Sequence, residues 1–270
     1  MLLVSWIAAV IACLAYGVAT VLQSVGARRA ATATGVGGVV GIVTQLPYLA
    51  GLALDGVGFL GNIVALRQLP LFLVEAIVAG SVGVTAIIAA IRGEKLGAKD
   101  WAALGVLGLG LILLSVSAAP AEATATSTAR NWTILVLAVL PAILGVVGYR
   151  LSGPTSVVLL SAAAGLGFSG VAIASRAMGS DPISLALLAS PLLWSVVAYG
   201  ALAVGFFGIA LQRGKVTVVA AVTFVIEVVV PSIIGLLLFG DSILAGYVPL
   251  AGAGFLLAIG GTIALSRFAE

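Results

Sequence analysis

Histidine is absent from this 270-residue chain, and cysteine occurs once, at Cys13. Without imidazole the chain can build neither a histidine metal site, nor a histidine proton relay, nor a Ser-His-Asp triad. It also contains no GxxxxGK(S/T) motif, so it has no P-loop for ATP. These absences argue against an enzyme, and we expect no cofactor.

Charge is scarce as well. Only 8% of the residues are charged and 62% are hydrophobic, with a mean hydropathy of +1.32. Soluble domains are about half apolar and a quarter charged. A chain this apolar cannot cover itself with polar groups, so its outer surface must face lipid. The net charge of +3 is small and dispersed, which argues against a nucleic-acid partner.

Long unbroken apolar runs, such as LGVLGLGLILLSVSA, predict helices, because the strands of a membrane barrel would alternate. The sequence therefore predicts an all-α polytopic transmembrane bundle. Residues 31–45 would make a tenth span, but they are polar and glycine-rich, so we favour nine. Span two is long enough to be tilted or broken near Pro47. The nine spans are expected at about 3–26, 40–66, 69–91, 101–119, 131–149, 156–177, 187–211, 216–239 and 245–266.

Two halves of the chain resemble each other. LAYG at 14–17 matches LGFS at 166–169, GFL at 58–60 matches GFF at 205–207, and GEKL at 93–96 matches GDSI at 240–243. The matches keep their order at a near-constant offset of about 147 residues. We therefore expect a first repeat at 1–119 (spans one to four), a linker and fifth span at 120–155, and a second repeat at 156–270 (spans six to nine). An odd number of spans from one copy to the next inverts the second, as in many carriers.

The positive charges indicate the orientation. Arg67, Arg130 and Arg176 fall on one side of the membrane, and the other nine cations fall on the opposite side. The positive-inside rule then places the N-terminus outside and the C-terminus in the cytoplasm of a multi-pass plasma (inner) membrane protein. The nine cations are Arg28, Arg29, Arg92, Lys95, Lys99, Arg150, Arg213, Lys215 and Arg267.

Three acids fall inside the predicted spans. Asp55 and Glu227 lie near the middle of spans two and eight, and Glu75 lies about six residues into span three, roughly 9 Å deep. Ionisable groups within a bilayer are costly and usually face a cavity or a partner. No Lys or Arg lies well inside a span to pair with them. They are candidates for protonation, cation binding or hydrogen bonding to a polar solute, although a structural role as buried neutral acids stays open.

Helical spacing adds residues to this candidate site. Tyr48, Asp55 and Asn62 recur every seven residues, which places them on one face of span two. Pro231 follows Glu227 by four residues and removes the hydrogen bond to its carbonyl, leaving a polar oxygen beside the carboxyl group. Broken helices with free carbonyls are common at carrier sites.

Aromatic and terminal charged residues have two interpretations. Four aromatic residues either line a cavity or belong to the core or an interfacial belt: Tyr16, Phe168, Trp194 and Tyr199. We expect Arg150 and Arg176, at span ends, to extend to the interface. Glu94 and Asp241, in turns, need only solvated or capping roles.

Two segments resemble the helix–turn–helix signature of the drug/metabolite transporter superfamily. They are LPLFLVEAIVAGSVGVTAIIAAIRGEKLGAKDWAALGVLGLGLILL from Leu69 and ALQRGKVTVVAAVTFVIEVVVPSIIGLLLFGDS from Ala210, and YGVATVLQSVGARR resembles the opening helix. The resemblance covers nearly the whole chain and is closest to the EamA-like and NIPA-like branches. It implies a transporter, and the NIPA-type likeness raises Mg²⁺ as a solute.

The sequence thus favours a gradient-driven secondary transporter of a small solute that works by alternating access. A divalent cation (Mg²⁺) transporter and a lipid or lipid-linked precursor translocase are the alternatives. The expected partners are membrane lipid and a small solute or cation, and a homodimer stays open. The solute, the coupling ion and any metal ligands are not assigned.

Overall fold

The computed structural model describes residues 2–32, 45–93, 96–119, 121, 126–179, 188–214 and 216–265. Nearly all of these residues are helical, and an isolated β-bridge joins Ala118 to Ile243. The helices are α1 (Leu2–Thr32), α3 (Leu46–Ala65), α4 (Leu71–Ala79), α5 (Ser81–Ile91), α6 (Ala98–Ser117), α7 (Thr128–Leu137), α8 (Val139–Arg150), α9 (Gly153–Met178), α10 (Pro191–Arg213), α11 (Val216–Leu238) and α12 (Val248–Leu265).

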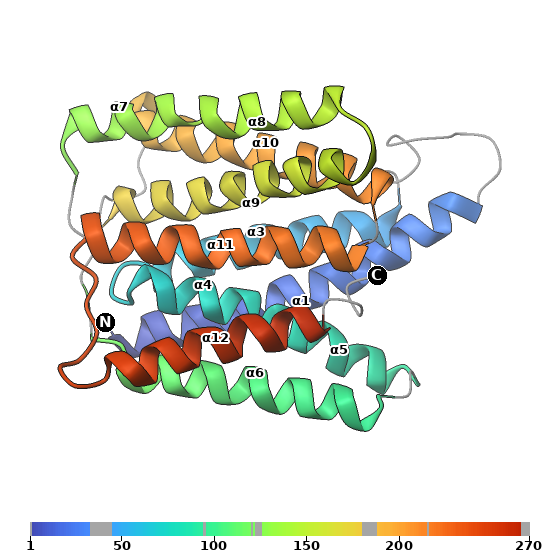
Figure 1. The fold of residues 1–270 in the computed structure, drawn as a ribbon, viewed down its shortest axis with the longest axis horizontal. Coiled ribbons are helices and arrows are strands. Elements are labelled where there is room, and N and C mark those ends of the chain that lie inside the picture. The colour runs from blue at the N-terminus through green and yellow to red at the C-terminus, as the bar shows by residue number, and fades with distance from the viewer. Residues whose placement is uncertain are drawn as a thin grey trace.

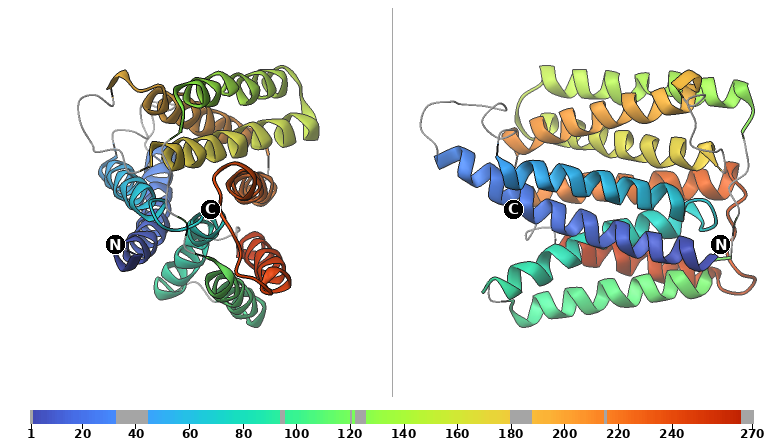
Figure 2. Two further views of the ribbon diagram at one scale, coloured as in Figure 1. Left: turned by 90° about the vertical axis from the view of Figure 1, so that its left-hand side faces the viewer. Right: turned by 180° about the vertical axis from the view of Figure 1, so that it is seen from behind.

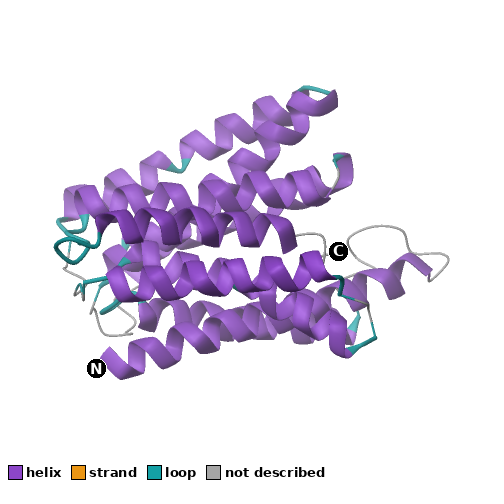
Figure 3. Cartoon of the chain, turned by 60° about the horizontal axis from the view of Figure 1, so that its bottom comes forward, coloured by secondary structure: helices purple, strands orange, loops and turns teal. Residues whose placement is uncertain are grey.

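The helices form one bundle and run roughly antiparallel (Figure 1). We call the end where α1 begins the N-terminal end; α3, α6, α9 and α11 finish there. Seen end on, α7 to α10 form one side of the bundle, while α1 and α3 to α6 lie on the other (Figure 2). The connections described between helices are short (Figure 3).

Eight helices or helix pairs are long and apolar enough to cross a membrane, with α4–α5 and α7–α8 each counting as one span. The ninth, α11, has a shorter described apolar stretch at Val222–Leu238. The prediction of a polytopic helical bundle is therefore confirmed, and all nine expected spans correspond to helical segments in the described residues. Large apolar side chains cover the outside, including Leu3, Leu237 and Leu256, each more than 70% exposed.

Prolines explain several helix boundaries. Pro47 lies in the first turn of α3, so span two starts there and is not broken at that residue. A proline in the first turn lacks only an N–H that would have no intrahelical partner. Pro141 has no N–H for the carbonyl of Leu137, which accounts for the break between α7 and α8 at Ala138. The tenth span considered at 31–45 lies mostly outside the described residues.

The helix pairing is alike in the two halves. α1 packs along α3 as α9 packs along α10, and α1 packs on α5 as α9 packs on α11. Two further pairs, α4 with α11 and α6 with α12, join the halves. α1 and α9 run in opposite directions (Figure 1). This pairing is the one expected of inverted repeats, although the repeat itself stays a prediction from the sequence.

The centre of the bundle is α4. Its residues from Leu71 to Ile77 are all buried, as is Ala79, and Leu71, Leu73 and Val74 have no exposed surface. A helix that is apolar on every side can lie only inside a protein or a membrane. The one charged residue of this helix, Glu75, is therefore held deep in the protein.

Candidate functional site

Glu75 and Asn62 meet in the interior between α3 and α4. Glu75 is 2% exposed and Asn62 is 7% exposed. Their side chains are hydrogen bonded to each other. Because Oδ1 of Asn62 has no hydrogen-bond partner, the amide nitrogen of Asn62 is the atom that faces Glu75.

The three acids predicted from the sequence come together around Tyr16. The carboxyl groups of Asp55, Glu75 and Glu227 all interact electrostatically with the phenol group of Tyr16, and Glu227 also interacts with Glu75. Four helices supply these residues: α1, α3, α4 and α11. We call Asp55, Glu75 and Glu227 the acidic cluster. The acidic cluster joins residues of both predicted halves. The residue spacing within one helix could not have predicted this contact.

Asp55 faces α1 and not lipid, as the heptad spacing of α3 predicts. Its Oδ2 atom accepts a hydrogen bond from Nε2 of Gln23. Glycines on α3 allow the two helices to approach: a Cβ on Gly51 would lie 2.9 Å from the carbonyl of Ala19, and one on Gly58 would lie 3.0 Å from the Tyr16 ring. Small residues commonly mark such contacts between membrane helices.

Two buried acceptor atoms of this site have no hydrogen-bond partner: Oε1 of Glu75 and Oδ1 of Asn62. Most buried polar side-chain atoms in proteins are hydrogen bonded, so an exception indicates strain or a missing partner. Here both exceptions are acceptors on neighbouring residues. The site therefore offers two acceptor atoms to a group that donates hydrogen bonds.

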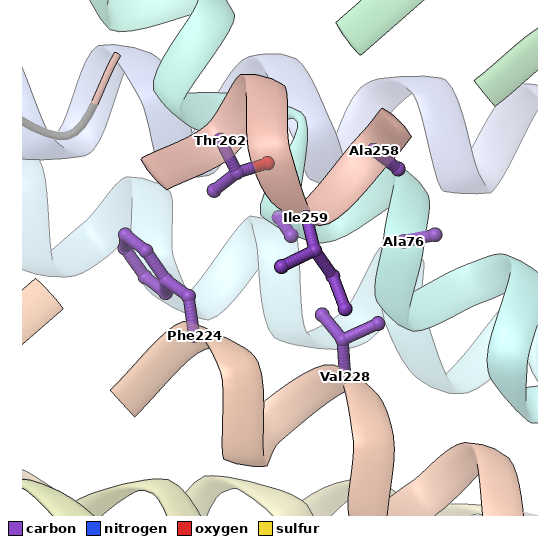
Figure 4. A pocket seen from close by; sticks show the side chains of 7 residues that line it. Ala76, Phe224, Val228, Ala258, Ile259 and Thr262 are labelled. Carbon is purple, nitrogen blue, oxygen red and sulfur yellow. The ribbon is translucent and has the colours of Figure 1, made fainter. Parts of the chain in front are cut away.

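A cavity of about 10 Å³ lies between α4, α11 and α12, and none of the three acids lines it. Ala76 and Val228, the neighbours of Glu75 and Glu227 in the chain, contribute to its wall, and Thr262 and Ile259 line the opposite side (Figure 4). This volume accommodates about one water molecule. A larger solute can enter only if these helices separate.

The other predicted site residues lie elsewhere. Trp194 is 54% exposed and donates to the carbonyl of Leu188, so it faces outward and does not line an interior cavity. Tyr199 is 6% exposed, packs in the core with α7, and donates to the carbonyl of Ile134. Phe168 forms an edge-to-face contact with Phe207 on α10. Tyr48 is half-buried against Gly26 of α1.

The expectation that Arg176 extends to the membrane interface is wrong. Its side chain is completely buried at the N-terminal end of the bundle, where Nη2 lies 2.7 Å from Oδ1 of Asp241. Asp241 is correspondingly buried, neither solvated nor a simple helix cap. The turn after α11 folds back over the end of α9 and covers both charges. Glu94 lies outside the described residues.

Arg176 and Asp241 also bind the backbone of the first half. Arg176 donates to the carbonyls of Leu66, Leu69 and Ala121, the last two at 3.0 and 3.1 Å. Oδ2 of Asp241 accepts from the N–H of Leu71 at 2.5 Å. We call these contacts the Arg176 network. The sequence held one signal for it, because Arg176 and Asp241 fall at span ends on the same side of the membrane.

No group of three or more Cys, Asp or Glu residues in the described part of the chain is arranged to hold a metal ion. Hard cations such as Mg²⁺ need convergent oxygen ligands with near-octahedral geometry.

Comparison with known proteins gives no relative: no protein-family model, no curated protein and no solved structure matches this chain.

Proposed function

We propose that this protein is a secondary transporter that moves a small solute by alternating access and draws its energy from a proton gradient. Its resemblance to the drug/metabolite transporter superfamily agrees with this proposal. The carrying observation is the acidic cluster, in which Glu75 is buried and Asp55 and Glu227 are half-buried within an apolar bundle, and which links α3 and α4 to α11. We assign Glu227 as the principal coupling acid.

Burial, with electrostatic repulsion as a second factor, explains why the cluster suits this role. Glu227 interacts with Glu75 on α4 and with Tyr16 on α1, and Asp55 on α3 acts on the same phenol group. Neither α3, nor α4, nor α11 contains a Lys or Arg. Burial disfavours the ionised form of each acid and repulsion between Glu75 and Glu227 adds to this, so the cluster gains stability by taking up a proton or a cation. Exchange of a bound proton for a bound cationic solute would couple the proton gradient to the movement of that solute.

The site also lies where alternating access requires it. α4 and α11 form a contact between the halves, and the acids sit on those two helices and on the adjoining α3. In carriers with inverted repeats, the site lies at the interface of the repeats and the halves rock around it. The Arg176 network would then hold the N-terminal end closed in the present conformation.

The test replaces Glu227 by Gln, which keeps size and hydrogen bonding while removing ionisation. Purified protein is placed in liposomes that contain a pH-sensitive dye, and proton movement is measured while amines, amino acids, Mg²⁺ and polyprenyl phosphates are added in turn. We expect wild-type protein to move protons with at least one solute, and Glu227→Gln to lose this movement at least tenfold. Asp100→Asn is the control, because Asp100 is buried at the start of α6, away from the cluster.

Solute-driven proton movement at the wild-type rate by Glu227→Gln would contradict the assignment of Glu227 and shift it to Asp55. Gel filtration and helical circular dichroism of each variant show whether the fold is kept. If no solute in the panel moves protons through folded wild-type protein, the proposal of proton-driven transport fails.

A further inference from the structure

We infer that the acidic cluster binds an organic ammonium or guanidinium ion through its N–H groups, with Glu75 and Asn62 as the acceptors that select it. This inference rests on the proposed function for the role of the site, but it concerns binding and can be tested without transport. It distinguishes among the solute classes that the sequence left open.

The site contains acceptor atoms that lack hydrogen-bond partners. Oε1 of Glu75 and Oδ1 of Asn62 are buried acceptors without partners. Two N–H groups nearby are engaged, since Gln23 donates to Asp55 and the amide of Asn62 faces Glu75, whereas Nε of Arg67, five residues beyond Asn62, has no partner. A buried acceptor left unpaired is destabilising, and a ligand that donates hydrogen bonds removes this cost. The site therefore favours a donor-rich solute over one rich in acceptors.

The charge of the site also favours a cation. Three carboxyl groups lie near Tyr16, and the basic residues of α1, Arg28 and Arg29, follow Tyr16 by at least twelve positions, about 18 Å along a helix. An anionic solute such as a polyprenyl phosphate would be repelled by three acids, although one cation, Arg67, follows Asn62 by only five positions. A cation instead relieves their mutual repulsion.

The type of cation follows from the ligand arrangement. Mg²⁺ demands octahedral geometry and usually keeps several waters, so it would meet these acceptors largely through water, and the described residues contain no group of three Cys, Asp or Glu that could ligate it directly. An ammonium or guanidinium ion spreads several N–H donors over a wider surface, so acceptors on separate helices can share it. A carboxylate and an amide carbonyl on adjoining helices are such acceptors.

The experiment measures thermal stabilisation of the detergent-purified protein by four chloride salts at equal ionic strength: methylammonium, guanidinium at non-denaturing concentration, tetramethylammonium and Mg²⁺. A ligand that binds the folded state raises the melting temperature. Tetramethylammonium is the matched control, because it carries the same charge as methylammonium without an N–H donor. We expect methylammonium or guanidinium to stabilise the protein saturably, with at least tenfold weaker binding of tetramethylammonium and Mg²⁺.

Two variants assign the acceptors. Glu75→Gln removes the charge of one acceptor and Asn62→Leu removes the other acceptor, and we expect at least a fivefold loss of affinity for the N–H cation in both. Asp100→Asn is again the control and should bind normally. Equal binding of tetramethylammonium and methylammonium, selective binding of Mg²⁺ or of an anion, or unchanged affinity in both folded variants would overturn the inference.

The outcomes separate this inference from the proposed function. Saturable binding of an N–H cation without proton movement in liposomes would uphold the inference and defeat proton-driven transport. Proton movement driven only by an anionic or uncharged solute would uphold transport and defeat the inference.

Discussion

Replacing Arg176 by Met should destabilise this protein more than almost any other single change of a charged residue. Met fills much of the space of the arginine side chain but provides no charge and no hydrogen-bond donor. Asp241 would remain completely buried with one described hydrogen bond, from the N–H of Leu71. The carbonyls of Leu66, Leu69 and Ala121 would each lose a donor.

The magnitude follows from these contacts. Removing one partner of a buried ion pair costs about 3–5 kcal/mol, because the remaining charge is uncompensated. We expect Arg176→Met to lose that amount from the free energy of unfolding. Asp241→Asn should lose less, about 1–3 kcal/mol, since the guanidinium group keeps its carbonyl acceptors. In the double variant Arg176→Met/Asp241→Leu no buried charge is left, so it should be more stable than Arg176→Met alone.

The assay is unfolding in mixed detergent–SDS micelles, followed by the fluorescence of the four tryptophans. Arg130→Met is the matched control: Arg130 lies at the same end of the bundle but is exposed, so its replacement should change stability by less than about 0.5 kcal/mol. A loss below about 1 kcal/mol in Arg176→Met, or a double variant no more stable than Arg176→Met, would refute the reasoning from the buried pair.

Two further predictions concern the bundle and its orientation. A Cβ on Gly110 would lie 2.8 Å from the carbonyl of Gly254 on α12, whereas one on Gly108 would meet nothing within 4 Å. Gly110→Ala should therefore destabilise the protein by about 1–3 kcal/mol in the same unfolding assay, and Gly108→Ala should not; equal effects would contradict the close α6–α12 contact. A reporter fused to the C-terminus should be active only in the cytoplasm, because Arg92, Lys99, Arg150 and Arg213 lie at the end of the bundle opposite the start of α1. Activity only outside the cell would reverse the orientation.

Much of the fold could be predicted because the bilayer restricts what an apolar chain can form. Unbroken apolar runs can satisfy their backbone only as helices, so the number and type of spans follow from hydropathy and from proline and glycine positions. The heptad of Asp55 and Asn62 likewise fixed the inward face of α3. The division of spans three and five at Gly80 and Ala138 was not predicted, since a one-residue break barely alters an apolar pattern.

The membership of the site depended on distances that the sequence does not contain. Asp55, Glu75 and Glu227 could be named from their burial in spans, but only the packing of α1, α3, α4 and α11 brought them to Tyr16. Trp194 and Tyr199 were grouped with them as aromatic residues of apolar helices. The structure separates them because α10 turns Trp194 outward and packs Tyr199 against α7.

The sequence by itself determined that this is a helical membrane protein with three unpaired acids inside it, because composition and periodicity decide which groups can face lipid. Only the tertiary structure decided which acids meet and where Arg176 lies. An arginine at a helix end can extend to the membrane interface or turn into the protein. It turns inward where a carboxylate from a distant part of the chain lies in the interior to pair with it. Asp241, 65 residues away along the chain, supplies that partner at 2.7 Å.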